Sequence, residues 1–396
     1  MNPFSLAKRQ LALDRKRMAH RPWLLAHKIE RMAVSPFAFL RGAAPLFYAL
    51  LKEDPSLARG ATGNGWIAGD LHLENFGCYR PEPPEHGKGT AVEFDINDFD
   101  DATVAPLRWD VLRVVTSLLL ATRGLGFPGK VSLALGADFV EAHSAALFGT
   151  RRTPPVPASV TRLLLLASQK SRADLLLGRT QGTGHHRRFV RGSRYQPISK
   201  GLQSQARRAF ELYARKLPPA IRPPSACLQV QDLAFRIAGT GSLGGLRLGV
   251  MVHGKGGKDG AWLFDMKEEG AAVATRLVTA TRAKGAERVL AALERCLAHP
   301  PTLAGTTTLE GKSLLVRRLA PQEERLDLAS VPRDEWEVLV PYLAARTAEV
   351  HRRGTDHLPR PWSRAAAAAL LERAITLAGI HEATYLAFCK LTSPAG

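Results

Sequence analysis

The chain has 396 residues, of which 45% are hydrophobic and 23% charged, and its formal net charge at pH 7 is +19. This length and apolar content exclude a largely disordered chain and predict two or three packed units. The four cysteines are far apart and form no CxxC pair, which excludes a zinc ribbon or a disulfide framework and fits a reducing compartment.

The first part of the chain is predicted to be mostly helical. Residues 1–60 show helical patterns punctuated by prolines, and they lack the apolar core of a secretory signal. WIAGDLHLENFG predicts a short strand and a polar loop, followed by a Pro/Gly-rich loop at 80–90 and a second strand at 91–98. Apolar residues at helical spacing predict a helix over 106–123, but Arg and Thr interrupt that run too often for a membrane span. We therefore expect a cytoplasmic protein.

Residues 151–222 form a strongly basic segment with 16 Lys and Arg against 2 acidic residues. Helices are predicted at 130–148, 158–178 and 202–216, with a basic loop at 181–201. Such a block favours an anionic partner, which could be nucleic acid, an acidic membrane face or a phosphorylated substrate. The plainer interpretation is a solvated surface rich in arginine, and nucleic-acid binding is left open.

The character of the sequence changes at PPAIRPPSA (218–226), after which a β-rich segment begins. Strands are predicted at 233–239, 245–252, 261–267 and 306–319, with a hairpin turn at 253–260 and a helix at 270–298. The last segment, 333–390, is predicted to be helical again. The expected organisation is a large helical part (1–226), a small β-rich part (227–320) and C-terminal helices that complete the large part (321–396).

A glycine loop, GTGSLGG (239–245), precedes the second strand of the β-rich segment and matches G-x-G-x-x-G. A dinucleotide-binding fold or a Walker loop needs a helix directly after the glycines, whereas a strand follows here. A strand–glycine loop–strand order is typical of the flap that covers nucleotide phosphates in protein kinases. We therefore predict nucleotide binding by this loop, with a simple β-turn as the alternative; the residues concerned are Gly239, Gly241, Ser242 and Gly244.

Lys267 ends the third strand of this segment, in FDMKEE. A lysine at this position can reach the α- and β-phosphates of a nucleotide as a point charge. It needs a carboxylate partner, which we expect from the following helix. Glu287 has a plausible separation and Glu294 is the rival, while an ordinary surface lysine is the plainer alternative.

The stretch GDLHLENFG (69–77) supplies a candidate catalytic loop. Asp70 and Asn75 have the D-x-x-x-x-N spacing of a kinase catalytic loop. We predict that Asp70 takes or orients the proton of a substrate hydroxyl, and that the amide oxygen of Asn75 binds a metal ion.

The stretch FDINDFDDA (94–102) supplies a candidate metal loop. Asp98 follows a predicted strand and is expected to bind Mg²⁺, which prefers oxygen ligands. Strand alternation turns Asp100 toward the same side, as a second metal ligand. The alternative for both stretches is a capped turn with solvated acids.

These motifs together resemble a known branch of enzymes. GDLHLEN, NDFDDA and PLRWDVLRVVTSL are similar to the aminoglycoside-phosphotransferase and choline-kinase branch of the protein-kinase-like superfamily. The resemblance implies that Asp70 is the catalytic base, that Asn75 and Asp98 bind magnesium, that Asp110 is the buried aspartate bracing the catalytic loop, and that His72 has a structural role. More closely, the chain resembles the bacterial domain-of-unknown-function 2252 family over roughly 30–355, through SPFAFLRG, GDLHLENFG, FDINDFD and the later glycine loop.

One departure from ordinary kinases concerns the order of the motifs. There the glycine loop and the lysine precede the catalytic loop, whereas here they follow it. A circular permutation would reconcile the two orders, with VPYLAARTAEVHRRGT (340–355), including His351, as the helix that leads into the GD-x-H loop. The expected fold class is thus α+β, a circularly permuted, two-lobed kinase-like fold with a large helical lobe and a small antiparallel β lobe.

The function expected from these features is an ATP- and Mg²⁺-dependent phosphotransferase acting on a small-molecule acceptor. Nucleotidyl transfer to a protein by the same site is an alternative. A metal-dependent phosphoesterase is less favoured, because its GNH[DE] loop is absent from the sequence. A further alternative is a non-catalytic module that binds a nucleotide, or nucleic acid through residues 151–222.

Overall fold

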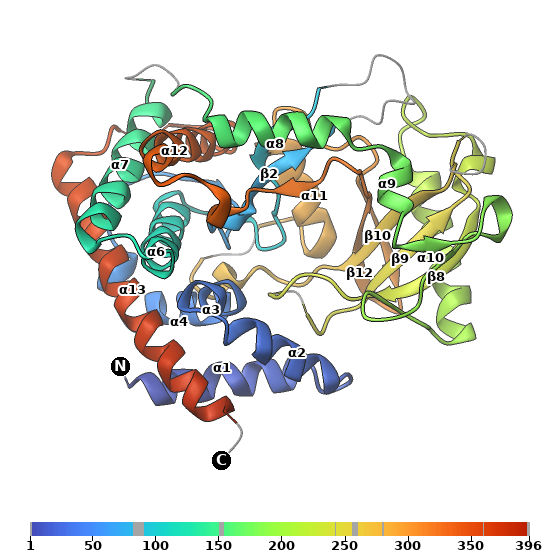
Figure 1. Cartoon of the computed structure of the whole chain (residues 1–396), viewed down its shortest axis with the longest axis horizontal. Coiled ribbons are helices and arrows are strands. Elements are labelled where there is room, and N and C mark those ends of the chain that lie inside the picture. Colours follow the sequence, from blue (N-terminus) through green and yellow to red (C-terminus); the bar gives the residue numbers. More distant parts are fainter. Residues whose placement is uncertain are drawn as a thin grey trace.

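The computed structural model describes residues 2–81, 91–149, 154–241, 243–255, 260–278, 281–358 and 360–393. They form an α+β protein in which helices gather on one side and a six-stranded antiparallel sheet on the other (Figure 1). The helices are α1 Pro3–Arg17, α2 Trp23–Met32, α3 Pro36–Gly42, α4 Ala44–Glu53, α5 Pro55–Ala58, α6 Arg108–Gly124, α7 Gly129–Leu147, α8 Ala158–Gln169, α9 Arg172–Leu176, α10 Lys200–Lys216, α11 Gly285–Cys296, α12 Trp336–Arg353 and α13 Arg364–Thr392. The strands are β1 Asn64–Ile67, β2 Phe76–Tyr79, β3 Glu93–Ile96, β4 Thr103–Pro106, β5 Thr180–Gln181, β6 Arg188–Phe189, β7 Tyr195–Gln196, β8 Val230–Arg236, β9 Arg247–Val252, β10 Trp262–Glu268, β11 Gly305–Leu309, β12 Lys312–Arg318 and β13 Glu324–Arg325.

The helical side is organised around α6, in which every residue from Trp109 to Thr122 is buried. A helix buried all round must be enclosed by other elements, and α3, α7 and α13 pack against it. α12 lies along α7, and the long α13 crosses the helical side to reach α1, so that the first and last helices are in contact (Figure 1). None of the described helices is long and apolar enough to cross a membrane.

The six-stranded sheet has the order β11-β12-β10-β9-β8-β7. Successive side chains of a strand point to opposite faces, so each strand contributes to two environments. One face is apolar and packs on α10, where Phe264 of β10 meets the rings of Phe210 and Tyr213. The other face carries the polar residues Asp265 and Lys267 of β10 toward the rest of the molecule.

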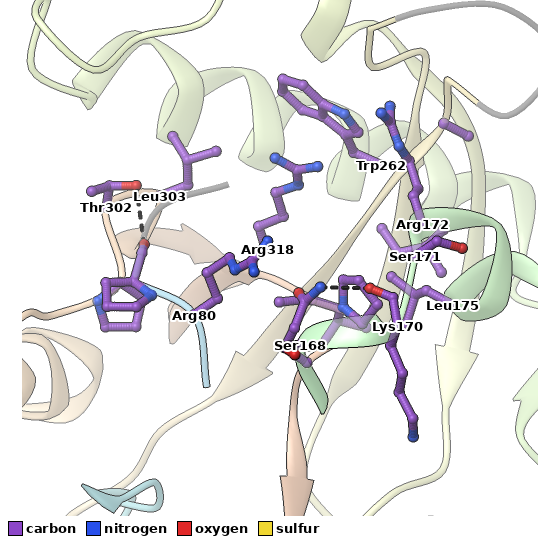
Figure 2. Close-up of a pocket in the computed structure, with 18 residues that line it drawn as sticks. Arg80, Ser168, Lys170, Ser171, Arg172, Leu175, Trp262, Thr302, Leu303 and Arg318 are labelled. Atoms are coloured by element: carbon purple, nitrogen blue, oxygen red, sulfur yellow. Dashed lines mark hydrogen bonds between the residues drawn. The ribbon is translucent and has the colours of Figure 1, made fainter. Parts of the chain in front are cut away.

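The outer half of that second face is covered by the segment containing α9 and β5–β7. Phe189 and Tyr195 stack there with ring centroids 4.3 Å apart, over Gly249 of β9. A Cβ at Gly249 would lie 2.9 Å from the Tyr195 ring, so only glycine fits beneath it. A separate pocket lies among α9, the start of β10 and the residues after β12 (Figure 2).

The structure agrees with most predicted elements and differs at three places. The helix expected at 270–298 is α-helical only in α11, Gly285–Cys296. The stretch 306–319 is a hairpin of β11 and β12, since Glu310 and Gly311 both have positive φ (51° and 76°) and reverse the chain. The boundary predicted at residue 227 falls inside the sheet layer, because β7 and α10 precede it.

Several predictions fall outside the described residues. They are the surface-loop prediction over 82–90, the tip of the hairpin turn at 256–259, and the assignment of Ser242 to the nucleotide.

Candidate active site

The GDLHLEN loop (69–75) joins β1 to β2, and its first residues are held by a buried carboxylate. Asp110, in the first turn of α6, is fully buried and accepts hydrogen bonds from the backbone N–H of Ala68 (2.6 Å) and of Gly69 (2.9 Å). The Tyr48 hydroxyl donates to the Gly69 carbonyl oxygen (2.5 Å). A carboxylate with two backbone donors fixes the direction in which the chain leaves β1. This is the bracing position that the resemblance implied for Asp110.

The support continues behind Asp110 into two more helices. His351 on α12 has its Nε2 3.3 Å from the Asp110 carboxylate, and its Nδ1 is 3.0 Å from the Nε2 of His143 on α7. All three side chains are completely buried. Burial holds the pKa of His143 well below its usual range, with His351 adding to the effect. A buried, hydrogen-bonded chain therefore ties the loop to the helical core.

Asp70 follows the braced residues Ala68 and Gly69 and lies beside the buried guanidinium group of Arg113. It forms an ion pair with Arg113, which lies one turn after Asp110 on α6 and is fully buried. Burial raises the pKa of Asp70 to about 7; Arg113 opposes the rise, while Asp101 and Asp98 add to it. A carboxyl group that titrates near neutral pH is suited to take up a proton in catalysis.

Two further polar residues of the loop, His72 and Asn75, are buried. The Asn75 side-chain oxygen accepts from the backbone N–H of His72 (2.7 Å), which occupies one lone pair of the atom predicted to bind a metal ion. The Asn75 carbonyl oxygen accepts from the backbone N–H of Asn97 (2.9 Å), which joins this loop to the acidic loop. The ring of His72 packs edge-on against Phe37, and burial, aided by neighbouring arginines, holds its pKa well below the usual range. Both residues therefore shape the loop.

The acidic loop, 97–102, brings its aspartates to three different places. The Asp98 carboxylate is half-buried and accepts from the backbone N–H of Asp100 (3.3 Å). Asp101 accepts from the backbone N–H of Val273 (3.0 Å), and a Cβ on Gly69 would collide with the Asp101 carbonyl oxygen. The acidic loop therefore lies directly against the GDLHLEN loop, and Asp101 serves its attachment.

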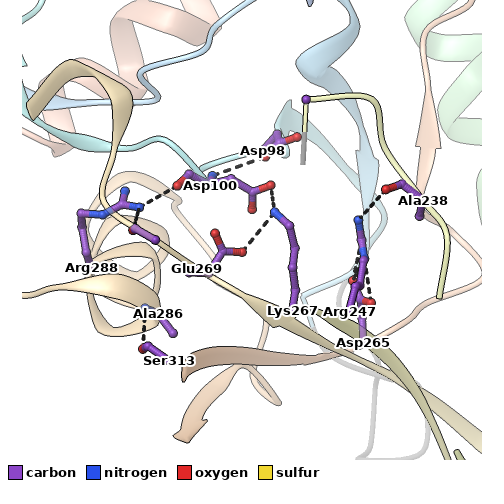
Figure 3. Close-up of polar contacts among 12 residues, drawn as sticks. Asp98, Asp100, Ala238, Arg247, Asp265, Lys267, Glu269, Ala286, Arg288 and Ser313 are labelled. Atoms are coloured by element: carbon purple, nitrogen blue, oxygen red, sulfur yellow. Dashed lines mark hydrogen bonds and ion pairs between the residues drawn. The ribbon is translucent and has the colours of Figure 1, made fainter. Parts of the chain in front are cut away.

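Lys267 of β10 meets the acidic loop across 167 residues of sequence (Figure 3). Its ammonium group forms an ion pair with Asp100 and a second one, at 3.1 Å, with Glu269. Burial raises the pKa of Glu269 and Asp98 adds to this, whereas Lys267 opposes it. The predicted meeting of Lys267 with the metal loop is present in the structure, with Asp100 as its partner.

The carboxylate predicted to hold Lys267 was assigned wrongly. Glu287 and Glu294 are both exposed on α11 and make no contact with Lys267, whose partner is Glu269 from the end of its own strand. The charged residue that α11 turns inward is Arg288, which donates to the backbone carbonyl oxygen of Asp100 (Figure 3) and to that of Ala102. The helix therefore holds the acidic loop through a cation on its inner face.

The glycine loop lies over Asp70. A Cβ on Gly241 would be 3.9 Å from the Asp70 carboxylate, and Gly239 and Gly244 have φ of 77° and 99°, which favours glycine. Two arginines of the N-terminal helices hold the loop: Arg17 donates to the Gly241 carbonyl oxygen (2.9 Å) and Arg31 to that of Gly239 (2.5 Å).

A cavity of about 240 Å³ links these parts. Its lining includes Asp98, Asp100, Gly239 and Lys267. Asp70 does not line it, but the glycine loop spans the two places, since Gly239 lines the cavity and Gly241 lies beside Asp70.

A charged cluster on the wall of the cavity was not predicted from the sequence. Asp265 lies two residues before Lys267 on the same face of β10. It is paired doubly with Arg247 (Figure 3), and also with Arg236 at 2.8 Å. Burial alone would raise the pKa of Asp265, but the two arginines outweigh it and hold the pKa below the usual range. Strand alternation from Lys267 would have placed Asp265 in the site.

The carboxylates that line the cavity suit a hard cation that is bound by few protein ligands. Within the described ranges, no three His, Cys, Asp or Glu side chains are grouped so as to hold a metal ion. Mg²⁺ is usually bound by one or two carboxylates together with phosphate oxygens and water. Asp98 and Asp100, which both line the cavity, fit that requirement.

The basic segment uses many of its arginines within the fold. Arg222 donates to the carbonyl oxygens of Arg215 and Leu217 at the end of α10, and Arg191 pairs with Asp232 of β8. Residues 151–153 of the segment lie outside the described ranges. The predicted anionic partner for 151–222 stays a prediction.

Comparison with known proteins identifies the family. Residues 20–391 match the model of the family described as "Uncharacterized protein conserved in bacteria (DUF2252)". No curated protein and no solved structure matches the chain. Since the match spans most of the sequence, the chain belongs to the DUF2252 family.

Proposed function

We propose that this DUF2252 protein is an ATP- and Mg²⁺-dependent phosphotransferase that acts on a small acceptor bearing a hydroxyl or amine group. The observation that carries the proposal is the contact of Lys267 with the acidic loop at one cavity, beneath a glycine loop. Two motif sets far apart in the sequence, each typical of phosphoryl transfer, meet there.

The connectivity of the sheet supports a circularly permuted, kinase-like arrangement. Along the chain, β8 leads to the glycine loop, β9, the lysine strand β10, α11 and the β11–β12 hairpin. In protein kinases the glycine loop likewise joins two strands, and the lysine lies on the third. In this proposal β8–β12 would form the small lobe, and the GDLHLEN and acidic loops would belong to the large lobe.

Each residue of the site has a role in the proposed reaction. Lys267 would bind the phosphates as a point charge, and the glycine loop would cover them. Mg²⁺, held by Asp98 and Asp100, would neutralise charge on the phosphates. Asp70 would accept the proton of the acceptor hydroxyl, for which a pKa of about 7 is well matched. Asp110 would keep the loop in place.

The surroundings of Asp70 favour an acceptor with negative charge. A second hollow, of about 350 Å³, lies beside Gly239 and is lined by Arg31, Arg41 and Arg325. The backbone of Arg41 is close to Asp70, since its carbonyl oxygen and the Asp70 carboxylate both lie within 4 Å of a Cβ placed on Gly241, while its guanidinium pairs with Glu74 (2.7 Å). A phosphate or carboxylate on the acceptor would find donors there.

A thermal-shift experiment with ATP and Mg²⁺ tests the proposal. Ligand binding to the folded state stabilises it by about 2.7 kcal/mol at a concentration 100 times Kd. We expect the melting temperature of the wild type to rise, and that of Asp98→Ala and Lys267→Ala to stay unchanged. Asp138→Ala and Lys130→Ala, at exposed positions, are matched controls that should respond as the wild type does. The absence of a shift in the wild type, or an equal shift in all variants, would refute the proposal.

A further inference from the structure

We propose that the outward face of α10 is a docking surface for the phosphate backbone of duplex nucleic acid. α10 covers the apolar face of the six-stranded sheet, whereas Lys267 lies on the opposite face. Figure 1 shows α10 on the side of the sheet, away from α7 and α13. A partner bound there would not touch the candidate active site, so the inference does not rest on the proposed phosphotransferase activity.

The sequence of α10 separates an apolar face from a basic one. Phe210 and Tyr213 are buried against the sheet, where both rings contact Phe264. On the opposite side, exposed residues recur every three or four positions, which is the spacing of one helix face. The residues of this outward face are Lys200, Ser204, Arg208, Glu211 and Arg215. At a rise of 1.5 Å per residue, they extend over about 22 Å.

The exposed cations of α10 are free of carboxylate partners within the part of the chain that the structure describes. This holds for the three cations of the outward face and for Lys216 at its edge. Arg208 donates to the Oγ atom of Ser204 (2.9 Å), which is a neutral group. By contrast, Arg123, an exposed arginine of α6, is paired with Glu382. The charge of the outward face is therefore available to a partner.

Glu211 is the single acidic residue of α10, which carries five basic residues among its 17. It weakens the positive potential of the outward face, but it forms no ion pair with a described residue. The helix keeps an excess of positive charge, which complements a partner with closely spaced negative charges. A nucleic acid duplex carries one phosphate charge per about 1.7 Å of its axis.

The composition of the outward face favours a duplex over other polyanions. A helix that binds a membrane surface inserts an apolar face into the lipid, but that face of α10 is already buried on the sheet. Leu212 is the one large hydrophobic residue of this fully described helix that is exposed. Single strands are bound by stacking bases on aromatic rings, and the rings of Phe210 and Tyr213 are buried. Lysine, arginine and serine are the side chains that contact the phosphates of a duplex.

A fluorescein-labelled DNA duplex of 20 base pairs and arbitrary sequence serves as the probe. Fluorescence anisotropy measures its Kd for the full chain between 50 and 200 mM NaCl. We expect micromolar binding at 50 mM and a slope of log K against log salt concentration of about −3 to −4, since each phosphate contact contributes about −0.9. The absence of binding at 50 mM salt, or binding that does not depend on salt, would overturn the proposal.

A triple variant locates the binding. In the protein with Lys200→Gln, Arg208→Gln and Arg215→Gln, the Kd at 50 mM salt should rise at least tenfold, and the slope should become shallower by about 2 to 3. Glu211→Gln removes the opposing charge, so it should tighten binding at least twofold. All four side chains are exposed, so the melting temperature should stay that of the wild type. Unchanged binding in the triple variant would overturn the assignment to α10.

A second triple variant controls for net charge. It carries Lys130→Gln, Arg162→Gln and Lys390→Gln, which remove three charges at exposed positions of α7, α8 and α13. Its Kd should stay within twofold of the wild type, whereas an equal loss in both triple variants would show that the whole surface attracts the duplex and would overturn the site. Vesicles containing phosphatidylserine complete the test. If the α10 variant loses vesicle binding but keeps duplex binding, the partner is a membrane and the proposal is wrong.

Discussion

The two halves of the candidate active site are held in different ways. On the helical side, Asp70 is positioned through Asp110, whose carboxylate accepts backbone hydrogen bonds in a fully buried setting. On the sheet side, Lys267 is held by ion pairs with Asp100 and Glu269 at the wall of a cavity. The first set of contacts is part of the core and the second set lies where a ligand would bind. We propose from this difference that the helical half is built before any ligand arrives, and that the sheet half would exchange partners if the proposed nucleotide binds.

The largest effect is expected from breaking the support of the helical half. Asp110→Ala would leave two buried N–H groups and His351 without their acceptor, so we expect the free energy of unfolding to fall by about 3–5 kcal/mol. Asp138→Ala, at an exposed position of α7, should change it by less than about 0.5 kcal/mol. Urea denaturation measures both. Similar values for the two variants would show that Asp110 does not support the loop.

A smaller loss is expected where α11 holds the acidic loop. Arg288→Gln would remove the cation that donates to the carbonyl oxygens of Ala102 and Asp100, and we expect about 2–3 kcal/mol of destabilisation. Its neighbour Glu287 is exposed, so Glu287→Gln should be nearly neutral. The same denaturation experiment compares the pair. A large effect of Glu287→Gln with none of Arg288→Gln would reverse our assignment of the inner face of α11.

The pH dependence of stability probes Asp70 itself. Its pKa is raised to about 7 in the folded protein, so folding favours the protonated form. The stability due to this protonation is present below pH 4 and is lost as the pH rises through about 7. Relative to the wild type, the free energy of unfolding of Asp70→Asn, which cannot ionise, should rise by about 4 kcal/mol between pH 4 and pH 8, since each pKa unit corresponds to about 1.4 kcal/mol. A difference between the two proteins that does not vary with pH would contradict a raised pKa.

The smallest effect is expected on ATP affinity at the sheet half of the site, where Lys267 is paired with Asp100. In Asp100→Asn the ammonium group of Lys267 loses one competing carboxylate, so ATP without Mg²⁺ should bind about tenfold more tightly, a change of about 1.4 kcal/mol. With Mg²⁺ present the sign should reverse, because a metal ligand is lost. Glu294→Gln, an exposed change on α11, is the control and should alter neither affinity. Calorimetry with and without Mg²⁺ measures the ATP affinity of Asp100→Asn relative to the wild type. A change in affinity of the same sign in both conditions would contradict the proposal that Lys267 exchanges Asp100 for the nucleotide.

The short motifs of the site could be found from the sequence because their chemistry is local. The GDLHLEN and FDINDFDDA stretches each specify a loop through residues a few positions apart, and the lysine strand follows its glycine loop closely. The same holds for the α+β class and for most elements, which follow from periodicity. The contact between Lys267 and Asp100, which are 167 residues apart, follows from no local pattern. That these two parts of the chain would meet was inferred from the order of the motifs and from the resemblance.

The partners of the site residues were harder to predict. Glu269 was missed because the partner of Lys267 was sought on a helix, although period-two alternation puts 265, 267 and 269 on one face of the strand. Arg113 counted only as an interruption of an apolar run, although its place one turn after Asp110 puts it on the same helix face, where it pairs with Asp70. The rotation of α11, which turns Arg288 inward and Glu287 outward, depends on packing that the sequence alone does not specify.

The most direct test of the central claim is a crystal structure with ATP and Mn²⁺, which replaces Mg²⁺ and is located by its anomalous signal. We predict a manganese peak at the carboxylates of Asp98 and Asp100, phosphates beneath the glycine loop, and an ammonium group of Lys267 that has left Asp100 to contact the phosphates. Nucleotide bound elsewhere on the protein, or a manganese peak away from both aspartates, would contradict it.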